Sequence, residues 1–279
     1  MIIKKDLILP TEGKKPILFD VYYQASAGPK PLVIFCHGYK GFKDWGPWHL
    51  VAEAFANAGF CFVKFNFSHN GGTVEQPIDF PDLDAFAENN FSKELDDLER
   101  LLTHFDNGCE HLPKIGSKTS LIGHSRGAGI VLIKAKEDAR IDNVITWAGV
   151  SDFKSRFQEG TDEFEYWKRK GVIFVENSRT KQQLPHNFQF YEDFKSNEER
   201  FTLKKVVKGL EKPLLIIHGT DDETVGLNEA QAMQQWSSTA QIEIIADADH
   251  VFGGSHPWED ESLPQHLKEA VEKTTDFLE

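Results

Sequence analysis

Short apolar runs alternate with longer amphipathic stretches along most of the chain. The runs are rich in Val, Ile, Leu and Phe and have the length of β-strands. They span Ile2–Leu9, Ile17–Tyr23, Pro31–Cys36, Phe60–Phe67, Thr119–Ile122, Asn143–Ala148, Pro213–His218 and Gln241–Ile245. The stretches between them carry apolar residues at helical spacing, which predicts helices. These helices cover Trp48–Ala58, Phe91–Phe105, Gly127–Lys136, Asn228–Trp236 and Leu263–Leu278.

The alternation of strands with helices predicts parallel strands joined by crossover helices that cover both faces of one sheet. Several runs show no polar alternation, which is typical of strands buried on both sides. A turn at Thr11–Lys14 joins the first two strands. We therefore predict an α/β fold with a mostly parallel central sheet and helices on both faces, formed by residues 1–279 as a single domain.

The interval from Asp152 to Val206 interrupts this rhythm and is rich in charged and aromatic residues. A loop of this length without secondary structure is uncommon inside a compact domain. We predict that residues 152–206 form a short cap or lid inserted between two strands, with Gly171–Phe174 and Phe188–Tyr191 paired as a hairpin. Its aromatic side chains either line a pocket for an acyl or aryl group or form a small core of the cap itself.

The charge balance narrows the range of partners. The chain has 31 Lys and Arg residues against 44 Asp and Glu residues, a formal net charge of −13 at pH 7. Such a chain is repelled by phosphate backbones and anionic lipid, so we expect no nucleic acid partner and no membrane-surface role. No apolar window has the length of a membrane span. A small molecule is the expected partner, and the sequence indicates no oligomeric state.

The cysteines and the first residues of the sequence bear on cofactors and on the compartment. Cys36 and Cys61 lie in apolar runs, where a buried small hydrophobic residue is the usual role. No Cys-x-x-Cys or paired Cys/His spacing occurs, so we predict no metal and no cofactor. The segment Met1–Lys5 lacks the apolar region of a signal peptide, and we expect a soluble, cytoplasmic protein.

The strongest chemical signal is Gly123-His124-Ser125-Arg126-Gly127, which lies between a predicted strand and a predicted helix. This is the G-x-S-x-G pattern of a nucleophile elbow. In such a turn the serine has a strained backbone, and the glycines leave room for backbone that a β-carbon would strike. The N-terminus of the following helix directs its amides and positive dipole end toward the serine. Ser125 is the candidate nucleophile, and a turn that merely packs is the alternative.

A serine hydroxyl is a weak nucleophile at neutral pH and needs a base, which in turn needs an orienting acid. The loop after the strand Pro213–His218 contains two candidate acids, Asp221 and Asp222. Two candidate bases, His250 and His256, follow the last strand, and His250 lies nearer the end of that strand. The residues alone leave both pairs open.

A tetrahedral acyl intermediate also needs two N–H donors aimed at its oxyanion. The amide of Arg126, directly after the candidate nucleophile, is expected to be one of them. The loop that follows the strand PLVIFC, which begins His37-Gly-Tyr39, is the expected source of the other. For His37, His124 and His218, packing or hydrogen bonding to the backbone is the expected role.

Together these motifs resemble the α/β-hydrolase superfamily, and they cover the chain from about Pro31 onward. The resemblance includes dienelactone-hydrolase-like proteins, serine aminopeptidase-like (monoglyceride-lipase-like) proteins and bacterial feruloyl or cinnamoyl esterases. Its chain order of Ser, acid and His and its H-G-x-x-D-x-x-V pattern imply Asp222 as the acid, although some relatives carry the acid at the position of Asp152. The resemblance also implies His250 as the base and the amide of Tyr39 as the second oxyanion donor.

One loop departs from the family pattern. After the fourth predicted strand many relatives carry Asp-x-Arg-Gly-x-Gly-x-Ser, whereas this chain reads Phe-Ser-His-Asn-Gly-Gly-Thr over Phe67–Thr73. Roles tied to that arginine and aspartate therefore do not carry over. Ser125 itself argues against dehalogenase chemistry, which uses Asp at that position, and against dienelactone hydrolysis, which uses Cys.

The sequence thus predicts a serine esterase or thioesterase that uses Ser125, Asp222 and His250. A serine peptidase of the same fold is the nearest alternative, since the same three side chains serve amides. An aminopeptidase needs acidic groups beside the site, and the predicted cap offers Glu159, Asp162, Glu163 and Glu165. A catalytically inactive binding protein on a hydrolase scaffold is the alternative of another class.

Overall fold

The computed structural model describes residues 1–9, 12–26 and 28–279. The first residue of the turn predicted at Thr11–Lys14 lies outside these residues. The described residues form an 8-stranded sheet in the order β1-β2-β4-β3-β5-β6-β9-β10. Its strands are β1 (Ile2–Leu9), β2 (Ile17–Tyr23), β3 (Lys30–Cys36), β4 (Cys61–Phe65), β5 (Ile115–His124), β6 (Asn143–Trp147), β9 (Leu214–Gly219) and β10 (Ala240–Ile245).

Parallel pairing dominates this sheet. From β4 through β3, β5, β6 and β9 to β10, every neighbouring pair is parallel. At the other edge, β1 and β2 pair in antiparallel fashion, and so do β2 and β4. The central strands β4 and β9 are buried along their whole length, as their unbroken apolar sequences predict. The predicted α/β fold with a mostly parallel sheet is confirmed.

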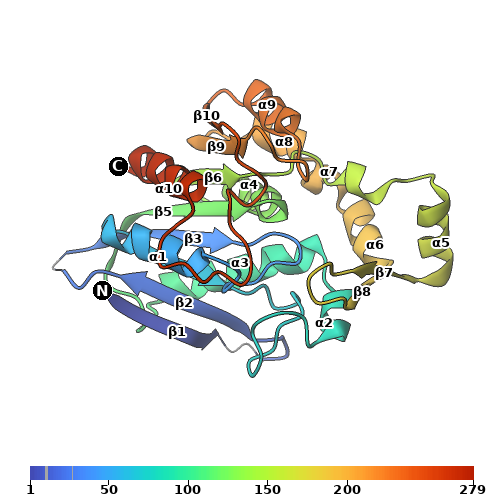
Figure 1. Cartoon of the computed structure of the whole chain (residues 1–279), viewed down its shortest axis with the longest axis horizontal. Coiled ribbons are helices and arrows are strands. Elements are labelled where there is room, and N and C mark those ends of the chain that lie inside the picture. Colours follow the sequence, from blue (N-terminus) through green and yellow to red (C-terminus); the bar gives the residue numbers. More distant parts are fainter. Residues whose placement is uncertain (10–11, 27) are drawn as a thin grey trace.

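Helices cover both faces of the sheet, as predicted (Figure 1). The buried residues of α1 and α10 share one apolar core, and those of α3, α4, α8 and α9 share the core of the opposite face. These helices are α1 (Trp48–Asn57), α3 (Phe91–Asp106), α4 (Arg126–Glu137), α8 (Leu203–Lys208), α9 (Leu227–Trp236) and α10 (Gln265–Leu278). Within the described part of the chain, no helix combines the length and apolarity needed to cross a lipid bilayer.

Two elements outside the predicted cap differ from the sequence prediction. β5 begins at Ile115, four residues before the predicted strand, because its first residues pair with β3 although they are partly exposed and lack an apolar pattern. The short helix α2 (Leu83–Ala87) was not predicted. It begins where the Asp82 side chain accepts a hydrogen bond from a helix amide, which is a typical N-cap.

The segment between β6 and β9 contains several helices and a separate hairpin, and it projects beyond the sheet in Figure 1. Residues 152–206 are called the inserted segment below. Its elements are η1 (Lys154–Phe157), α5 (Asp162–Lys170), β7 (Val172–Glu176), β8 (Gln183–Asn187), α6 (Gln189–Ser196), α7 (Glu198–Phe201) and the first turn of α8.

The hairpin of the inserted segment pairs β7 with β8. The prediction that Gly171–Phe174 pairs with Phe188–Tyr191 is therefore wrong for its second strand, because Phe188–Tyr191 leads into α6. The ring of Tyr191 packs on Phe164 in α5, and that of Phe194 packs on Phe157. Residues three apart share one face of a helix but lie on opposite faces of a strand. Tyr191 and Phe194 are three residues apart and both pack on aromatic rings of the inserted segment, which favours a helix over a strand at these positions.

A cluster of buried charges lies beneath the loop that follows β3. Asp20 on β2 and Lys64 on β4 are cross-strand partners, fully buried, and form an ion pair of 2.6 Å. Lys43, which is also buried, lies 2.9 Å from Asp20, and Asp44 lies 2.5 Å from each of the two lysines. Buried charges are tolerated when they are paired and hydrogen-bonded. The cluster therefore fastens the loop after β3 to the two strands.

Candidate active site

Ser125 lies on the tight turn between β5 and α4. Its backbone has φ of 55° and ψ of −119°, a strained combination for a residue with a side chain. A β-carbon on Gly123 would lie 2.4 Å from the carbonyl oxygen of Gly127. One on Gly127 would lie 2.5 Å from the carbonyl oxygen of Cys36. Both glycines of the motif are thus required by contacts between backbones.

The structure brings Ser125 together with His250 and Asp222. His250, in the loop after β10, has Nε2 3.0 Å from Oγ of Ser125 and Nδ1 2.8 Å from Oδ2 of Asp222. In this geometry Nδ1 donates to the carboxylate and Nε2 accepts from the hydroxyl. Such a chain of hydrogen bonds can move a proton from a hydroxyl to an imidazole whose orientation is fixed.

Asp222 is held as a carboxylate by its neighbours. Its Oδ1 accepts hydrogen bonds of 2.9 and 2.8 Å from the amides of Thr224 and Val225. Its Oδ2 lies 3.3 Å from Nε2 of His218, in addition to its contact with His250. Burial raises the pKa of Asp222, but the hydrogen bonds from the two histidines and the Val225 amide outweigh it and hold the pKa well below its usual range.

The rival candidates are placed elsewhere. Asp221 is exposed, and its carboxylate accepts a hydrogen bond from the hydroxyl of Thr220. Asp152 is also exposed and accepts from the backbone amide two residues later. Nδ1 of His256 accepts from the amide of Gly46 at 2.9 Å. Of the candidates named from the sequence, Asp222 and His250 are the pair in mutual contact.

The other motif histidines bond to backbone, as expected. Nδ1 of His37 lies 2.9 Å from the adjacent carbonyl, and Nε2 of His218 lies 2.7 Å from the carbonyl of Val225. Nε2 of His124 lies 2.9 Å from the carbonyl of His250 and so supports the loop that carries that imidazole. Burial lowers the pKa of His37 to about 4 and that of His124 to about 3, which keeps both rings neutral.

The loop after β3 passes directly against Ser125. A β-carbon on Gly38 would lie 2.8 Å from the Ser125 β-carbon and 3.3 Å from Oγ. The next amide belongs to Tyr39, and the amide of Arg126, the first residue of α4, directly follows the serine. Neither amide donates to a backbone carbonyl within the described residues. Both donors are therefore available to an oxygen atom bound beside Ser125.

The side chain of Tyr39 connects this loop to the inserted segment. Its hydroxyl lies 2.7 Å from Nε2 of His186 on β8. Burial raises the pKa of Tyr39 to about 12. Burial, assisted by the cations of Arg126 and Lys40, lowers the pKa of His186 to about 3. A neutral phenol thus donates to a neutral imidazole at this contact.

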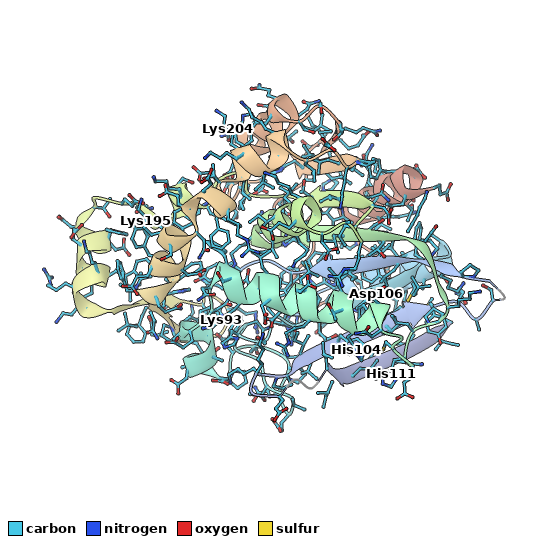
Figure 2. All side chains as sticks on the ribbon, turned by 180° about the vertical axis from the view of Figure 1, so that it is seen from behind. Lys93, His104, Asp106, His111, Lys195 and Lys204 are labelled. Atoms are coloured by element: carbon cyan, nitrogen blue, oxygen red, sulfur yellow. The ribbon has the colours of Figure 1, made fainter. Side chains whose placement is uncertain are left out.

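Arg126 has a buried carboxylate partner that the sequence alone did not predict. Nη2 of Arg126 lies 2.6 Å from Oε1 of Glu94, which is 1% exposed. Burial raises the pKa of Glu94, although the guanidinium opposes the shift. The carboxylate comes from the beginning of α3, beside Lys93, and Figure 2 shows that end of the helix directed toward the inserted segment. The pair holds the Arg126 side chain near the rings of Tyr39 and Phe190.

Two cavities open beside Ser125. The first, called the aromatic cavity, has a volume of about 350 Å³ and includes Ser125 and Arg126 in its lining. Its remaining wall comes mainly from α3 and the inserted segment, with Phe91, Phe153, Phe157, Trp167, Ile173 and Phe190. Phe91 stacks on Phe153 with ring centroids 4.0 Å apart, so these rings also form a core with one another.

The second, called the basic cavity, has a volume of about 390 Å³. Its lining includes Ser125 and, around it, Lys40, Trp45, Asn177, Arg179, His250 and His256. It lies between the loop after β3, the turn that connects β7 to β8, and the loop after β10. Within the described chain, neither cavity contains an Asp or Glu in its wall.

The acidic residues that motivated the aminopeptidase alternative do not line either cavity. Glu159, Asp162, Glu163 and Glu165 are exposed on the inserted segment. No group of three or more His, Cys, Asp or Glu side chains among the described residues is arranged to hold a metal ion.

No protein-family model and no curated protein matches the chain. Solved structures match over nearly its whole length. Est1E from Butyrivibrio proteoclasticus with ferulic acid bound is 16% identical, with a TM-score of 0.74 over 98% of this chain and 97% of that one. Alpha/beta hydrolase domain-containing protein 10 from mouse is 17% identical, with a TM-score of 0.69 over 98% and 99%. Dienelactone hydrolase from Anabaena variabilis is 15% identical, with a TM-score of 0.62 over 99% and 97%.

Proposed function

Since the chain has the α/β-hydrolase fold, we propose that it is a serine hydrolase that cleaves carboxylic esters or thioesters. The observation that carries this proposal is the hydrogen-bonded chain from Ser125 through His250 to Asp222. The ferulic acid complex among the structural neighbours supports a small acyl substrate. In this proposal residues 152–206 act as a cap that supplies much of the wall of the aromatic cavity.

The first half of the reaction forms an acyl-enzyme. Oγ of Ser125 attacks the acyl carbonyl carbon while Nε2 of His250 accepts the hydroxyl proton. Asp222 orients the imidazole and stabilises its charged form. The amides of Tyr39 and Arg126 donate to the developing oxyanion. The bond to the leaving group then breaks, and His250 delivers the proton to the leaving oxygen or sulfur.

The second half of the reaction restores the enzyme. A water molecule attacks the acyl-enzyme carbonyl carbon, and His250 accepts one of its protons. The same two amides stabilise the second oxyanion. The ester bond to Ser125 breaks, its Oγ regains a proton from His250, and the carboxylic acid leaves.

Hydrolysis of 4-nitrophenyl acetate, 4-nitrophenyl butyrate and a butyryl thioester tests the proposal. Ser125→Ala is expected to lower kcat by more than about 10³-fold, because it removes the hydroxyl that is bonded to Nε2 of His250, and no other hydroxyl of the described residues bonds to that nitrogen. Ser117→Ala is the matched control, since Ser117 is exposed near the opposite end of β5. Equal rates for wild type and Ser125→Ala would overturn the proposal.

The same preparation separates the alternatives. A fluorophosphonate is expected to add covalently to wild type and not to Ser125→Ala, as read by intact mass. An unlabelled wild-type protein would favour the inactive binding protein instead. Release of amine from aminoacyl naphthylamides without ester turnover would favour the peptidase, although the exposed acids of the inserted segment offer no amine site in either cavity.

A further inference from the structure

The two cavities beside Ser125 differ in polarity and charge: the wall of the first is mainly apolar, and that of the second carries positive charge. The aromatic cavity contains two arginines, Arg126 and Arg156, and each has a carboxylate partner close by. Arg126 pairs with Glu94, and Arg156 pairs with Glu229. Their charges are thus compensated within the protein, and the rest of that wall is largely apolar. A group bound there is therefore recognised chiefly through apolar contact.

The basic cavity contains a cation without such compensation. Nζ of Lys40 lies 3.2 Å from the carbonyl oxygen of Glu176, and it has no carboxylate partner among the described residues. Burial lowers the pKa of Lys40, as expected for an ammonium that has lost part of its water. Arg179, in the same wall, pairs with Asp79 through one nitrogen. This local excess of positive charge occurs in a chain whose net charge is −13.

The position of His250 decides which part of a substrate enters which cavity. Its side chain belongs to the wall of the basic cavity, and it is absent from the described wall of the aromatic cavity. A general acid must lie within hydrogen-bond reach of the atom that it protonates. In acyl transfer that atom belongs to the leaving group. The leaving group is therefore assigned to the basic cavity, and the acyl group to the aromatic cavity.

We propose that the substrate is an ester or thioester with a largely apolar acyl group and an anionic leaving group, and that Lys40 binds the anion in the basic cavity. This inference rests on the proposed serine hydrolase function. A carboxylate or phosphate on the alcohol or thiol can accept a charge-assisted hydrogen bond from Nζ of Lys40. The bond that breaks is the one between the acyl carbon and the leaving oxygen or sulfur, which takes its proton from His250. The anion itself is unchanged by the reaction.

Two chromogenic esters with the same acyl group test this assignment. They are 4-nitrophenyl butyrate, with a neutral leaving arm, and 3-carboxy-4-nitrophenyl butyrate, with an added carboxylate. Each kcat/KM is divided by the rate constant for hydroxide hydrolysis of the same ester, which removes intrinsic reactivity. We expect wild type to prefer the carboxylated ester by about tenfold, the size expected for one partly desolvated charged hydrogen bond.

Lys40→Met is expected to reduce this preference to about one, and Lys40→Arg is expected to retain it. Lys118→Met is the matched control, because Lys118 is exposed on β5 outside both cavities. Added NaCl should weaken the preference of wild type by screening, which provides a measurement that needs no variant. If both esters are turned over but the preference for the carboxylated ester changes neither with NaCl nor in Lys40→Met, the inference is overturned and the hydrolase proposal stays intact. No turnover of either ester and no fluorophosphonate labelling would remove both.

Discussion

The turn that carries Ser125 and the inserted segment that faces it are held in place by different kinds of contact. Around the turn the close contacts are between backbone segments, and a β-carbon added to Gly123 or Gly127 would lie 2.4–2.5 Å from a carbonyl oxygen. In the inserted segment the contacts are between aromatic side chains, as between Phe157 and Phe190, whose ring centroids are 5.3 Å apart. Backbone at a strand end has little room to move, whereas a ring can change its rotamer. The reactive turn should therefore tolerate far less change in side-chain volume than the cavity wall.

The largest expected effect is that of Gly123→Ala. Its new methyl group would meet the Gly127 carbonyl and the Ala128 backbone at 2.4–2.6 Å, so the turn must open. We expect the free energy of unfolding, measured by urea denaturation, to fall by more than about 4 kcal/mol. Gly116→Ala on the same strand is the matched control, because its nearest neighbour, the Lys30 carbonyl oxygen, would be 3.5 Å away. Equal losses for the two variants would contradict the backbone argument.

A smaller effect is expected where the same substitution meets a ring. A β-carbon on Gly129 would lie 2.2 Å from Cζ of Phe153 in the inserted segment. Gly129→Ala should lower the free energy of unfolding by about 3 kcal/mol, as for other overpacked sites. Adding Phe153→Leu, which removes the clashing ring edge, should recover part of that loss. Failure of the second substitution to recover any stability would indicate that the α4 backbone, and not the ring, is the rigid partner.

The smallest expected effect is on how the free energy of unfolding changes as the pH falls. Burial lowers the pKa of His186 to about 3, whereas a histidine in an unfolded chain titrates near 6.5. Below pH 6.5 the unfolded chain therefore binds more protons, so the stability that His186 contributes is present above pH 6.5 and is lost as pH falls. The loss is about 1.4 kcal/mol per pH unit for one such group, or about 2 kcal/mol by pH 5.

Urea denaturation at pH 7 and pH 5 measures this contribution. The difference in unfolding free energy between the two pH values should be about 2 kcal/mol smaller in His186→Gln than in wild type. Tyr39→Phe is the matched control, because it removes the same hydrogen bond and leaves the imidazole in place. If Tyr39→Phe reduces the pH response as much as His186→Gln does, the hydrogen bond from Tyr39, and not burial, sets the low pKa of His186.

The difference between backbone contacts at the Ser125 turn and side-chain contacts in the inserted segment also explains how well each region could be predicted from the sequence. The turn was predictable because the serine and the two glycines that it requires all lie in the short segment Gly123–Gly127, and the loops with Asp222 and His250 follow from the order of strands along the chain. In the inserted segment, Phe188–Tyr191 is aromatic in a way that suits a strand or a helix equally. Contacts with α5, distant in sequence, decide between them.

Two charged residues beside the site, Glu94 and Lys40, were not predicted from the sequence. Glu94 gave a usable signal, because it shares the buried face of α3 with Phe91 and Leu98, where a carboxylate needs a partner. Its partner depends on how α3 packs against α4, which no local pattern encodes. Lys40 gave no signal, since a lysine in a loop is usually a solvated surface residue. The role proposed for Lys40 depends on three separate loops that meet around one cavity.

The charge cluster beneath the loop after β3 has a consequence for the protein's evolution. Loss of Asp20 alone would break the buried ion pairs that it forms with Lys43 and Lys64 and leave Asp44 as the remaining carboxylate shared by both lysines; breaking a buried pair commonly costs about 3–5 kcal/mol. Replacement of a whole buried cluster by apolar side chains of similar volume is often neutral. Asp20, Lys43, Asp44 and Lys64 are therefore constrained to change together. Divergent descendants of this chain should keep the entire set or have lost it entirely, with few intermediates.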